Sequence, residues 1–408
     1  MLACPECDLL HRAGRPGRGT IQLCTRCGAV LGRGGAITLD GVLALHVAAL
    51  ILLALANAFP LMAVRLHGTE RMASIPGCVR VLDSLGWPWL SALLLTTVVL
   101  GPFVQLGGMI LVLLQLHRRR PGAWVPRVFR FLEEFQRWGM VEVFLLGILV
   151  SYAKLAQMAT VVPGLSLYAL GGFIVVAAMA ASSLEPRTVW EGAAPAPPSP
   201  GAARGSARRA DLQACSACGL LAPLSSQGPC GRCGASLHSR KPDSLSRTWA
   251  LLVASAILYL PANALPVTRV VSLGRMHDDT ILSGVLFFVR DGSWPLALVI
   301  FVASVLVPLI KFVVLTFLLL SVRYRSRWRP RQRAGLYRLT ELVGRWSMVD
   351  IFAITLMVAM LHMGSLASVV PRPGAMAFAL MVVATILAVR SFDPRLVWDA
   401  LEADRGPD

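Results

Sequence analysis

The chain has 408 residues, of which 56% are hydrophobic and 15% are charged, with a mean hydropathy of +0.65 and a formal net charge of +17. A soluble domain carries about 25% charged residues, so the composition excludes an ordinary soluble enzyme and predicts a polytopic membrane protein. The positive charge does not indicate a nucleic-acid partner, because the arginines are concentrated in particular loops.

The first predicted element is a small cysteine-rich module over residues 1–36. It contains "CPEC" and, sixteen residues later, "CTRC" followed by a glycine, where a tight knuckle needs a permissive backbone. Four thiolates at this spacing can surround one tetrahedral Zn²⁺ ion. We therefore predict a zinc ribbon whose ligands are Cys4, Cys7, Cys24 and Cys27.

A transmembrane module is predicted next, over 37–190. Its third span opens with "RWGMVEVF", which places the carboxylate of Glu142 about one turn inside an apolar segment. Its second span is long enough to require a tilt or a bend, and Pro102 supplies a possible bend. The four spans are roughly 41–60, 87–116, 139–161 and 166–184.

A segment rich in Ala, Pro, Gly and Ser over 191–210 predicts a flexible linker. A second cysteine module follows over 211–240, with "CSAC" and, eleven residues later, "CGRC" and a glycine. We predict a second zinc ribbon here, and iron in the same sites is an alternative. A saturated four-cysteine site has no open coordination position, so we expect folding and docking roles rather than catalysis. The ligands are Cys215, Cys218, Cys230 and Cys233.

The last predicted element is a second transmembrane module over 241–400, and it repeats the first. "VLGPFVQL" at 99–106 corresponds to "VLVPLIKF" at 305–312 with an offset of 206, and "RWGMVEVF" corresponds to "RWSMVDIF" with an offset of 208. Because each copy has an even number of spans, the two repeats have the same orientation. The spans of the second copy are roughly 248–266, 294–322, 347–369 and 375–391.

The predicted fold is thus an all-α polytopic membrane protein. It has two tandem four-helix transmembrane modules, which are parallel repeats, and each is preceded by a small cytoplasmic Cys4 zinc ribbon. With both termini in the cytoplasm, 30 of the 39 Lys and Arg residues lie on the cytoplasmic side and 7 on the other, which fits the positive-inside rule. The basic runs at 117–122 and 323–333 then face anionic lipid headgroups.

Ionisable side chains inside the membrane cost about 2.5–3.5 kcal/mol on insertion scales and are functional candidates by default. Lys311 lies twelve residues before the basic run, about 18 Å along a helix, and is near mid-membrane. Asp350 lies about one turn from the cytoplasmic edge, and a bend at Pro308 helps the two meet. Two interpretations stay open, a structural ion pair and an element that couples protonation to movement. Ser304, Ser347 and Thr385 are further polar candidates along the same seam.

The first repeat differs from the second at this place. It keeps Pro102 and Glu142 but has Gln105 at the position of Lys311. The Lys–acid pair is therefore predicted only in the second repeat. We interpret Glu142 as structural or vestigial and Asp350 as the acid that functions.

The paired CxxC motifs, "NAFP" and "NALP" after the first span of each repeat, and the two octets in a duplicated frame resemble the paraquat-inducible protein A family. The resemblance covers nearly the whole chain. It implies a bacterial inner-membrane protein that works with a periplasmic tunnel protein of the mammalian-cell-entry (MCE) domain class and moves phospholipids between the two membranes. Carried over by position, the family's polar network falls on Ser304, Lys311, Ser347, Asp350 and Thr385.

Two other classes of function stay open. One is a scaffold or assembly factor for the MCE complex. The other is a redox protein that exchanges electrons with quinone through its CxxC pairs. Zinc content and thiol reactivity separate the redox protein from the other two, and reconstituted lipid movement separates a transporter from a scaffold.

Overall fold

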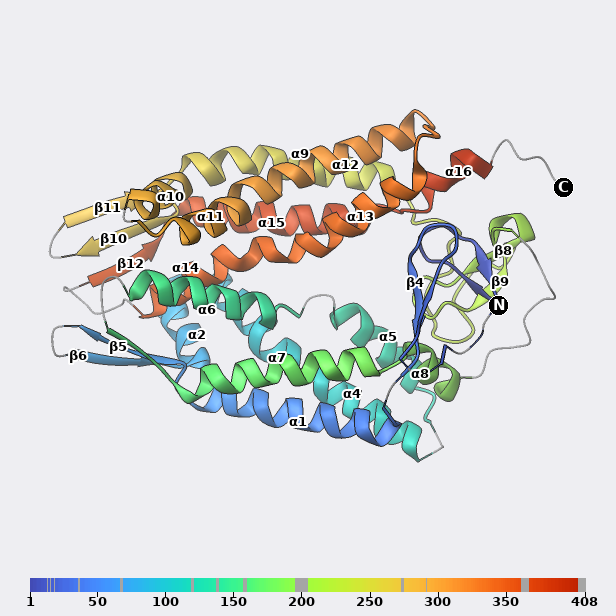
Figure 1. Cartoon of the computed structure of the whole chain (residues 1–408), viewed down its shortest axis with the longest axis horizontal. Helices are drawn as coiled ribbons and strands as arrows, with labels where there is room; N and C mark the ends of the chain where they lie inside the picture. Colours follow the sequence, from blue (N-terminus) through green and yellow to red (C-terminus); the bar gives the residue numbers. More distant parts are fainter. Residues whose placement is uncertain are drawn as a thin grey trace.

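The computed structural model describes residues 1–12, 14, 16–17, 19–35, 37–66, 69–118, 121–136, 139–156, 160–194, 205–272, 275–290, 292–360 and 367–402. Two helical modules lie side by side along the long axis of the molecule (Figure 1). The two cysteine modules lie at one end, which we call the ribbon end. Two small sheets lie at the opposite end, which we call the sheet end.

The first module is built from long apolar helices joined by short elements. Its first helix begins at a cap, where the Thr38 hydroxyl accepts a hydrogen bond from the Gly41 amide at 3.3 Å. In chain order the elements are α1 (Leu39–Ala58), β5 (Met62–Leu66), β6 (Thr69–Ala73), α2 (Ile75–Ser84), α3 (Pro88–Leu94), η1 (Leu95–Leu100), α4 (Gly101–His117), α5 (Val125–Gln136), α6 (Val141–Leu155), β7 (Thr160–Pro163), α7 (Leu165–Ser183) and α8 (Pro186–Ala193).

The second module repeats this order of elements, which confirms the internal duplication. Its elements are α9 (Ser244–Ala264), β10 (Thr268–Ser272), β11 (Arg275–Asp279), α10 (Ile281–Arg290), α11 (Trp294–Phe301), η3 (Val302–Leu306), α12 (Val307–Arg323), α13 (Pro330–Gly344), η4 (Arg345–Met348), α14 (Val349–Met360), β12 (Ala367–Pro371), α15 (Pro373–Ser391) and α16 (Leu396–Glu402).

Each long second span contains a π-helical turn just before its proline. In η1 the amide of Gly101 donates to the carbonyl of Thr96, and in η3 the amide of Val307 donates to that of Val302. The wider π turn changes the hydrogen-bond pattern of the helix just before Pro102 or Pro308, which has no backbone amide hydrogen to donate. The helix therefore continues through the proline instead of ending there.

Seven helices in the described part of the chain are long and apolar enough to cross a membrane. The expectation of eight regular spans is therefore not fully met. The expected span 139–161 corresponds to α6, which has only 15 residues, and residues 157–159 lie outside the described residues. The expected span 347–369 is α-helical from Val349 to Met360, at the end of a longer helical segment that begins at Pro330 and includes α13. Residues 361–366 of this span lie outside the described residues, and Ala367–Pro371 form the strand β12.

The expectation of an all-α protein is wrong at the sheet end. Two three-stranded antiparallel sheets, in the orders β6-β5-β7 and β11-β10-β12, join the connections between spans in each module. Strands of four or five residues are too short to give a clear alternating pattern in the sequence. In each sheet two neighbouring strands form a hairpin, and the third strand, β7 or β12, comes from a distant connection and pairs with the first strand of that hairpin.

The two modules contact each other mainly through α6 and α14 (Figure 1). The Ser151 hydroxyl donates to the carbonyl of Ala353 across this interface at 3.0 Å, and Gly147 allows a close approach, since a Cβ there would lie 2.8 Å from the Cβ of Phe352. A single cluster of buried apolar side chains includes residues of both modules. The modules therefore form one continuous core.

Candidate functional site

The eight CxxC cysteines form two compact clusters, as the sequence predicts. All are buried, and within each cluster the four sulfur atoms lie within 4.8 Å of one another. The closest sulfur pairs are 3.5 Å apart in the first cluster and 3.6 Å apart in the second. A tetrahedral zinc site with Zn–S bonds of about 2.3 Å requires sulfur atoms about 3.8 Å apart, whereas a disulfide requires about 2.05 Å. Each cluster therefore fits a four-thiolate metal site.

The backbone around each cluster forms matched knuckles. The residue after each CxxC pair has a left-handed conformation, with φ near 70° at Gly28, Gly219 and Gly234 and 65° at Asp8. Glycine adopts this conformation without strain. Asp8 is the one non-glycine residue among these four positions. The Asp8 carboxylate has a role of its own, because it pairs with Arg240 at 3.2 Å. His11 is a neighbour of the first site, with its Nε2 3.3 Å from the Cys24 sulfur.

Each cysteine cluster packs on the module of the other repeat. The first cluster (Cys4, Cys7, Cys24, Cys27) shares a core with Leu315, Tyr337 and Trp398 of the second module. The second cluster (Cys215, Cys218, Cys230, Cys233) shares a core with Met109, Phe129 and Trp190 of the first module. The ribbons thus cross between the modules, although β4 (Val30–Arg33) ends only shortly before α1 begins.

Two arginines at equivalent positions of the repeats hold the crossed ribbons. Arg130 on α5 donates to the carbonyl of Cys233 at 3.0 Å, and Arg338 on α13 donates to the carbonyl of Cys27 at 2.6 Å. Arg338 also donates to the carbonyl of Gly28 and pairs with Glu6 at 3.3 Å. Because the donors are charged, these hydrogen bonds are stronger than neutral ones.

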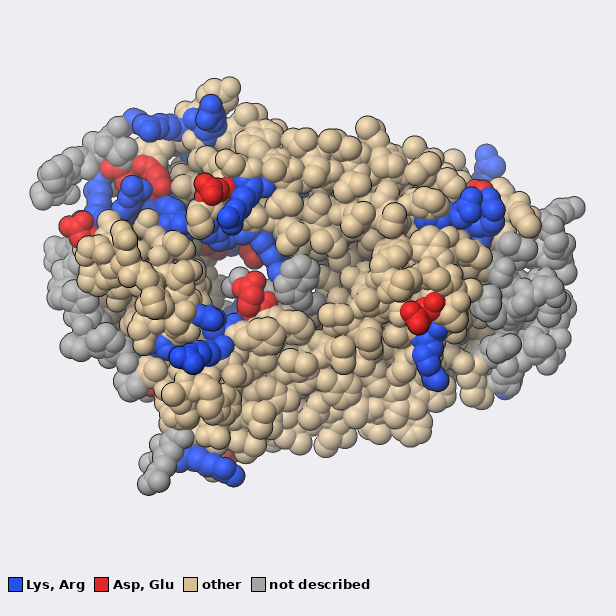
Figure 2. All heavy atoms as spheres, turned by 180° about the vertical axis from the view of Figure 1, so that it is seen from behind, with Lys and Arg blue, Asp and Glu red and all other residues tan. Residues whose placement is uncertain are grey.

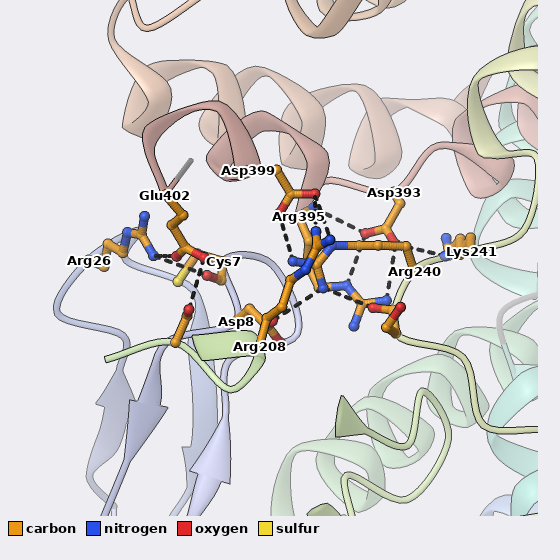
Figure 3. A network of polar contacts seen from close by, with 12 residues as sticks. Cys7, Asp8, Arg26, Arg208, Arg240, Lys241, Asp393, Arg395, Asp399 and Glu402 are labelled. Carbon is orange, nitrogen blue, oxygen red and sulfur yellow. Dashed lines mark hydrogen bonds and ion pairs between the residues drawn. The ribbon is translucent and has the colours of Figure 1, made fainter. Parts of the chain in front are cut away.

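A network of charged side chains completes the ribbon end (Figure 3). Arg240 pairs with Asp399 at 2.7 Å and with Asp8 at 3.2 Å, so it joins both the second module and the first ribbon. Burial alone lowers the pKa of Arg240, but the hydrogen bonds and charges of the two carboxylates outweigh it and raise the pKa above its ordinary value. Arg26 pairs with Glu402 at 2.6 Å and stacks on Trp398 at 4.5 Å from the ring centroid.

The two ribbons also contact each other. Ala3 of the first ribbon shares a small core with Leu212 of the second ribbon and with Ala207 just before it, and the amide of Leu10 donates to the carbonyl of Gly205 at 2.9 Å. Residues 195–204 of the predicted linker lie outside the described residues, while α8 extends to Ala193 and Arg208–Ala210 form a short 3₁₀ helix, η2. The strands of the ribbons are β1 (Leu2–Ala3), β2 (Leu10–His11), β3 (Ile21–Leu23) and β4 in the first, and β8 (Leu212–Ala214) and β9 (Leu221–Pro223) in the second.

Lys311 lies in the interior of the second module, with 1% of its surface exposed. Its ammonium donates to the hydroxyl of Ser347 at 2.8 Å and to the carbonyl of Gly344 at 3.3 Å. Ser347 is therefore a direct neighbour of Lys311, and the role of both residues in transport stays a prediction. Asp350 lies in the first turn of α14, but its side chain lies outside the described residues, so the predicted pair with Lys311 stays a prediction.

The other candidates of the polar network are buried but bind locally. The Ser304 hydroxyl donates to the carbonyl of Ile300 at 2.7 Å, and the Thr385 hydroxyl donates to that of Val382 at 2.7 Å. These bonds satisfy the two hydroxyls within their own helices. In the first module, Glu142 lies in the first turn of α6 with its side chain exposed.

A cavity of about 570 Å³ lies between the modules near the ribbon end. Figure 2 shows an opening in this region with acidic and basic side chains around it. Its lining includes Gly344, whose carbonyl accepts from Lys311, so the buried lysine lies directly behind the cavity wall. Other lining residues are Glu133, Gln136, Arg338, Glu341 and Arg390.

Sequence reasoning missed the helices that receive the ribbons, α5 and α13 together with α8 and α16. The repeat itself contained a signal, because "LEPRTVWE" at 184–191 corresponds to "FDPRLVWD" at 392–399. The tryptophans of these motifs, Trp190 and Trp398, are both buried beside a cysteine cluster. Trp190 stacks edge to face on Phe129 with their centroids 4.9 Å apart.

Comparison with known proteins gives a consistent result. The family model described as Paraquat-inducible protein A matches residues 39–194 and 245–402. The chain is 35% identical to the Intermembrane transport protein PqiA of Escherichia coli (strain K12), over 98% of this chain and 95% of that protein. It is 29% identical to the Lipophilic envelope-spanning tunnel protein A of the same strain, over 98% and 91%. It is 27% identical to a Probable intermembrane transport protein of Haemophilus influenzae, over 99% and 97%. No solved structure matches the chain significantly.

Proposed function

The chain belongs to the paraquat-inducible protein A family, and we propose that it is the inner-membrane component of an MCE-type lipid transport system. In this function it loads phospholipids into, or receives them from, a periplasmic tunnel protein with MCE domains, and it is not an enzyme. The observation that carries the proposal is the similarity, over nearly the full length of the chain, to proteins named for intermembrane transport. The seven membrane-capable helices agree with this multi-pass membrane location.

The proposed orientation places the ribbon end and both termini in the cytoplasm. Lys and Arg side chains gather mainly at the ribbon end, and the band between the two ends is nearly free of charge on the face shown in Figure 2. This distribution supports the positive-inside assignment. The small sheets then face the periplasm, where the tunnel protein is proposed to lie.

Each cysteine cluster is proposed to hold one zinc ion with a structural role. Four buried thiolates leave no open ligand position, and the sulfur spacing is close to that of a tetrahedral zinc site. The zinc-bound ribbons hold the two modules together at the ribbon end. The quinone-linked redox alternative requires thiols that react in the native protein, which fully ligated thiolates do not supply.

Lys311 and Asp350 are proposed to couple lipid movement to protonation. The Lys311 ammonium is buried and is bound by two neutral acceptors, Ser347 and Gly344, which compensate its lost hydration only partly. The charged form of Lys311 costs less free energy when the site opens to water, because the ammonium is then hydrated. Protonation of the lysine and movement of the helices are therefore linked. The inter-module cavity behind Gly344 gives the proposed route for water to the lysine.

The test is lipid transfer in proteoliposomes that contain the chain and its MCE partner. Labelled phospholipid is followed from donor to acceptor membranes with and without a proton gradient. We expect Lys311→Met and Asp350→Asn to abolish the gradient-dependent transfer. The control Thr355→Val removes another buried hydroxyl of α14, which donates to the carbonyl of Phe352 in its own helix, and keeps full transfer.

Two outcomes change the conclusion. Full transfer by both Lys311→Met and Asp350→Asn contradicts the coupling role and leaves the pair as a structural one. A complex that assembles but moves no lipid under any gradient favours the scaffold alternative.

A further inference from the structure

The first module contains a cavity of about 210 Å³ that the proposed transport function does not use. It lies among α1, α4, α5, α6 and α7, and most of its lining is apolar, including Leu106, Phe173 and Ile174. Its lining also contains the polar residues His46, Gln105, Glu133, Gln136 and Glu142. A mainly apolar cavity with a few converging polar groups is typical of a binding site for a small or amphiphilic molecule.

The internal repeat shows what this cavity corresponds to. Gln105 is the counterpart of Lys311, and Glu142 is the counterpart of Asp350. Gln136 and Gly139 are the counterparts of Gly344 and Ser347, the two residues that bind the Lys311 ammonium. All four of these first-module counterparts line the cavity. The cavity therefore lies where the second module places a lysine ammonium.

The polar groups of the cavity are suited to accept hydrogen bonds. The Oε1 atom of Gln105 is buried and has no hydrogen-bond partner in the described structure. The Nδ1 atom of His46 lies 2.8 Å from the carbonyl of Val42, which can only accept, so Nδ1 carries the hydrogen and Nε2 is left as an acceptor. Glu142 adds a carboxylate, and the cavity lining contains no Lys or Arg among the described residues. A ligand group that donates hydrogen bonds and carries a positive charge complements this set.

We propose that the first-module cavity binds the primary ammonium of an amphiphile, in the position that the Lys311 ammonium takes in the second module. The ligand class is an aminophospholipid with an ethanolamine headgroup. Its ammonium is bound by Gln105 and Glu142, and the apolar walls contact its aliphatic part. The volume equals that of about seven liquid waters at roughly 30 Å³ each, enough for a headgroup and its first methylenes but not for a whole lipid.

The proposed ligand is a substrate class for the proposed transport function, and its physiological role rests on that function. The binding test is independent of transport, so the two can fail separately. The chain purified in detergent is mixed with equimolar phosphatidylethanolamine and phosphatidylglycerol of identical acyl chains, and the bound lipids are counted by native mass spectrometry.

We expect the wild type to retain phosphatidylethanolamine about tenfold more than phosphatidylglycerol, since one charge-assisted contact is worth about 1.4 kcal/mol or more. Gln105→Lys places a tethered ammonium in the cavity, as Lys311 does in the second module, and abolishes the preference. Glu142→Gln reduces it. Gln105→Met, which has a similar volume and no ammonium, leaves the cavity open and keeps part of the preference through Glu142.

Competition identifies the recognised group. Dodecylammonium displaces phosphatidylethanolamine from the wild type, whereas dodecanol, with the same chain and no charge, does not. Free ethanolamine is expected to displace phosphatidylethanolamine only weakly, because the aliphatic part contributes to binding. If ethanolamine and dodecylammonium displace the lipid at the same concentration, the ligand is not a lipid. Each variant is required to elute as a single species with the wild-type metal content, so that a folding defect is recognised.

Two results overturn the site. One is equal retention of the two lipids by the wild type. The other is an unchanged preference in Gln105→Lys that is correctly folded.

Discussion

Phe144 and Phe352 occupy the same position in the two repeats and meet edge to face between α6 and α14, with their ring centroids 5.6 Å apart. They are the last residues of the octets "RWGMVEVF" and "RWSMVDIF". The octets therefore have a structural role besides carrying the acids Glu142 and Asp350. They supply one of the contacts between the two modules, next to those of Gly147 and Ser151.

The close approach of α6 and α14 beside these rings predicts a strong effect of a side chain at Gly147. Gly147→Leu has no space, because a Cβ alone would lie 2.8 Å from the Phe352 Cβ and 3.1 Å from the Ala353 amide nitrogen. Overpacking of this kind costs about 1–3 kcal/mol, so we expect a lower melting temperature in detergent. The matched control is Gly171→Leu in α7, where nothing lies within 4 Å of the position that a Cβ would take. Equal melting temperatures of the two variants contradict this interface.

The crossed ribbons predict that Arg338 and Arg130 stabilise the contact between the halves of the chain. Arg338→Ala removes charged hydrogen bonds to the carbonyls of Cys27 and Gly28. A hydrogen bond to a charged group contributes about 1.5–3 kcal/mol to stability, and less where the site is partly exposed, as here. We expect the first ribbon to become sensitive to limited proteolysis, and Arg130→Ala to expose the second. Arg247→Ala removes an exposed arginine of α9 and serves as the control. Unchanged proteolysis of all three variants shows that the apolar contacts suffice.

Removal of metal is expected to separate the ribbons from the modules. The purified chain is expected to contain two zinc ions, and Cys7→Ser or Cys218→Ser each reduces the content to one, as measured by elemental mass spectrometry. In the wild type, a strong chelator makes the eight CxxC thiols reactive, because the thiols are released as the ribbons unfold. Cys78→Ala, which removes a buried cysteine outside the clusters, keeps both metals. Reactive CxxC thiols in the untreated protein, without bound metal, support the redox alternative instead.

The hairpin of β10 and β11 predicts a shifted titration at the sheet end. Arg269 and Asp278 are directly opposite in the strand register, and two hydrogen bonds of 2.6 and 2.7 Å join their side chains. These bonds and the arginine charge hold the pKa of Asp278 below its ordinary value of about 3.9. The contribution of the pair to stability is therefore present above about pH 3.9 and is lost as the pH falls through the lower, folded-state pKa.

Carbon-13 NMR of the Asp278 carboxyl checks this titration. Arg269→Met is expected to raise the midpoint toward the ordinary value, because the hydrogen bonds and charge of Arg269 are lost. Because both side chains are exposed, the effect on overall stability is small, and the readout is the midpoint itself. Identical midpoints in the wild type and the variant contradict the ion pair.

Much of the candidate site is predictable from local sequence. CxxC spacing identifies all eight cysteines of the two clusters, because each pair forms its knuckle within a few residues. The depth of Lys311 in an apolar run, together with the three-residue spacing of Ser347 and Asp350, places Lys311 and Ser347 on a common seam, and the structure joins them. The sheets and the ribbon-binding helices are less predictable. Short strands such as β7 have no strong periodicity. The helices α5 and α13, which contact the ribbons, are amphipathic, and the same pattern is expected of a helix that lies on a membrane surface.

The sequence by itself determined the elements whose physics is local. An apolar run long enough to cross a bilayer forms a helix because its backbone must satisfy its own hydrogen bonds. The CxxC pairs form compact cysteine clusters because each knuckle is built from neighbouring residues. The order of the repeats follows from the duplication alone. Only the tertiary structure decided which surfaces meet: that each ribbon packs on the opposite module, that Phe144 meets Phe352, and that the first module has a cavity where the second has Lys311. These relationships depend on contacts between residues that are far apart in the chain, and no local pattern contains the shape of both partners.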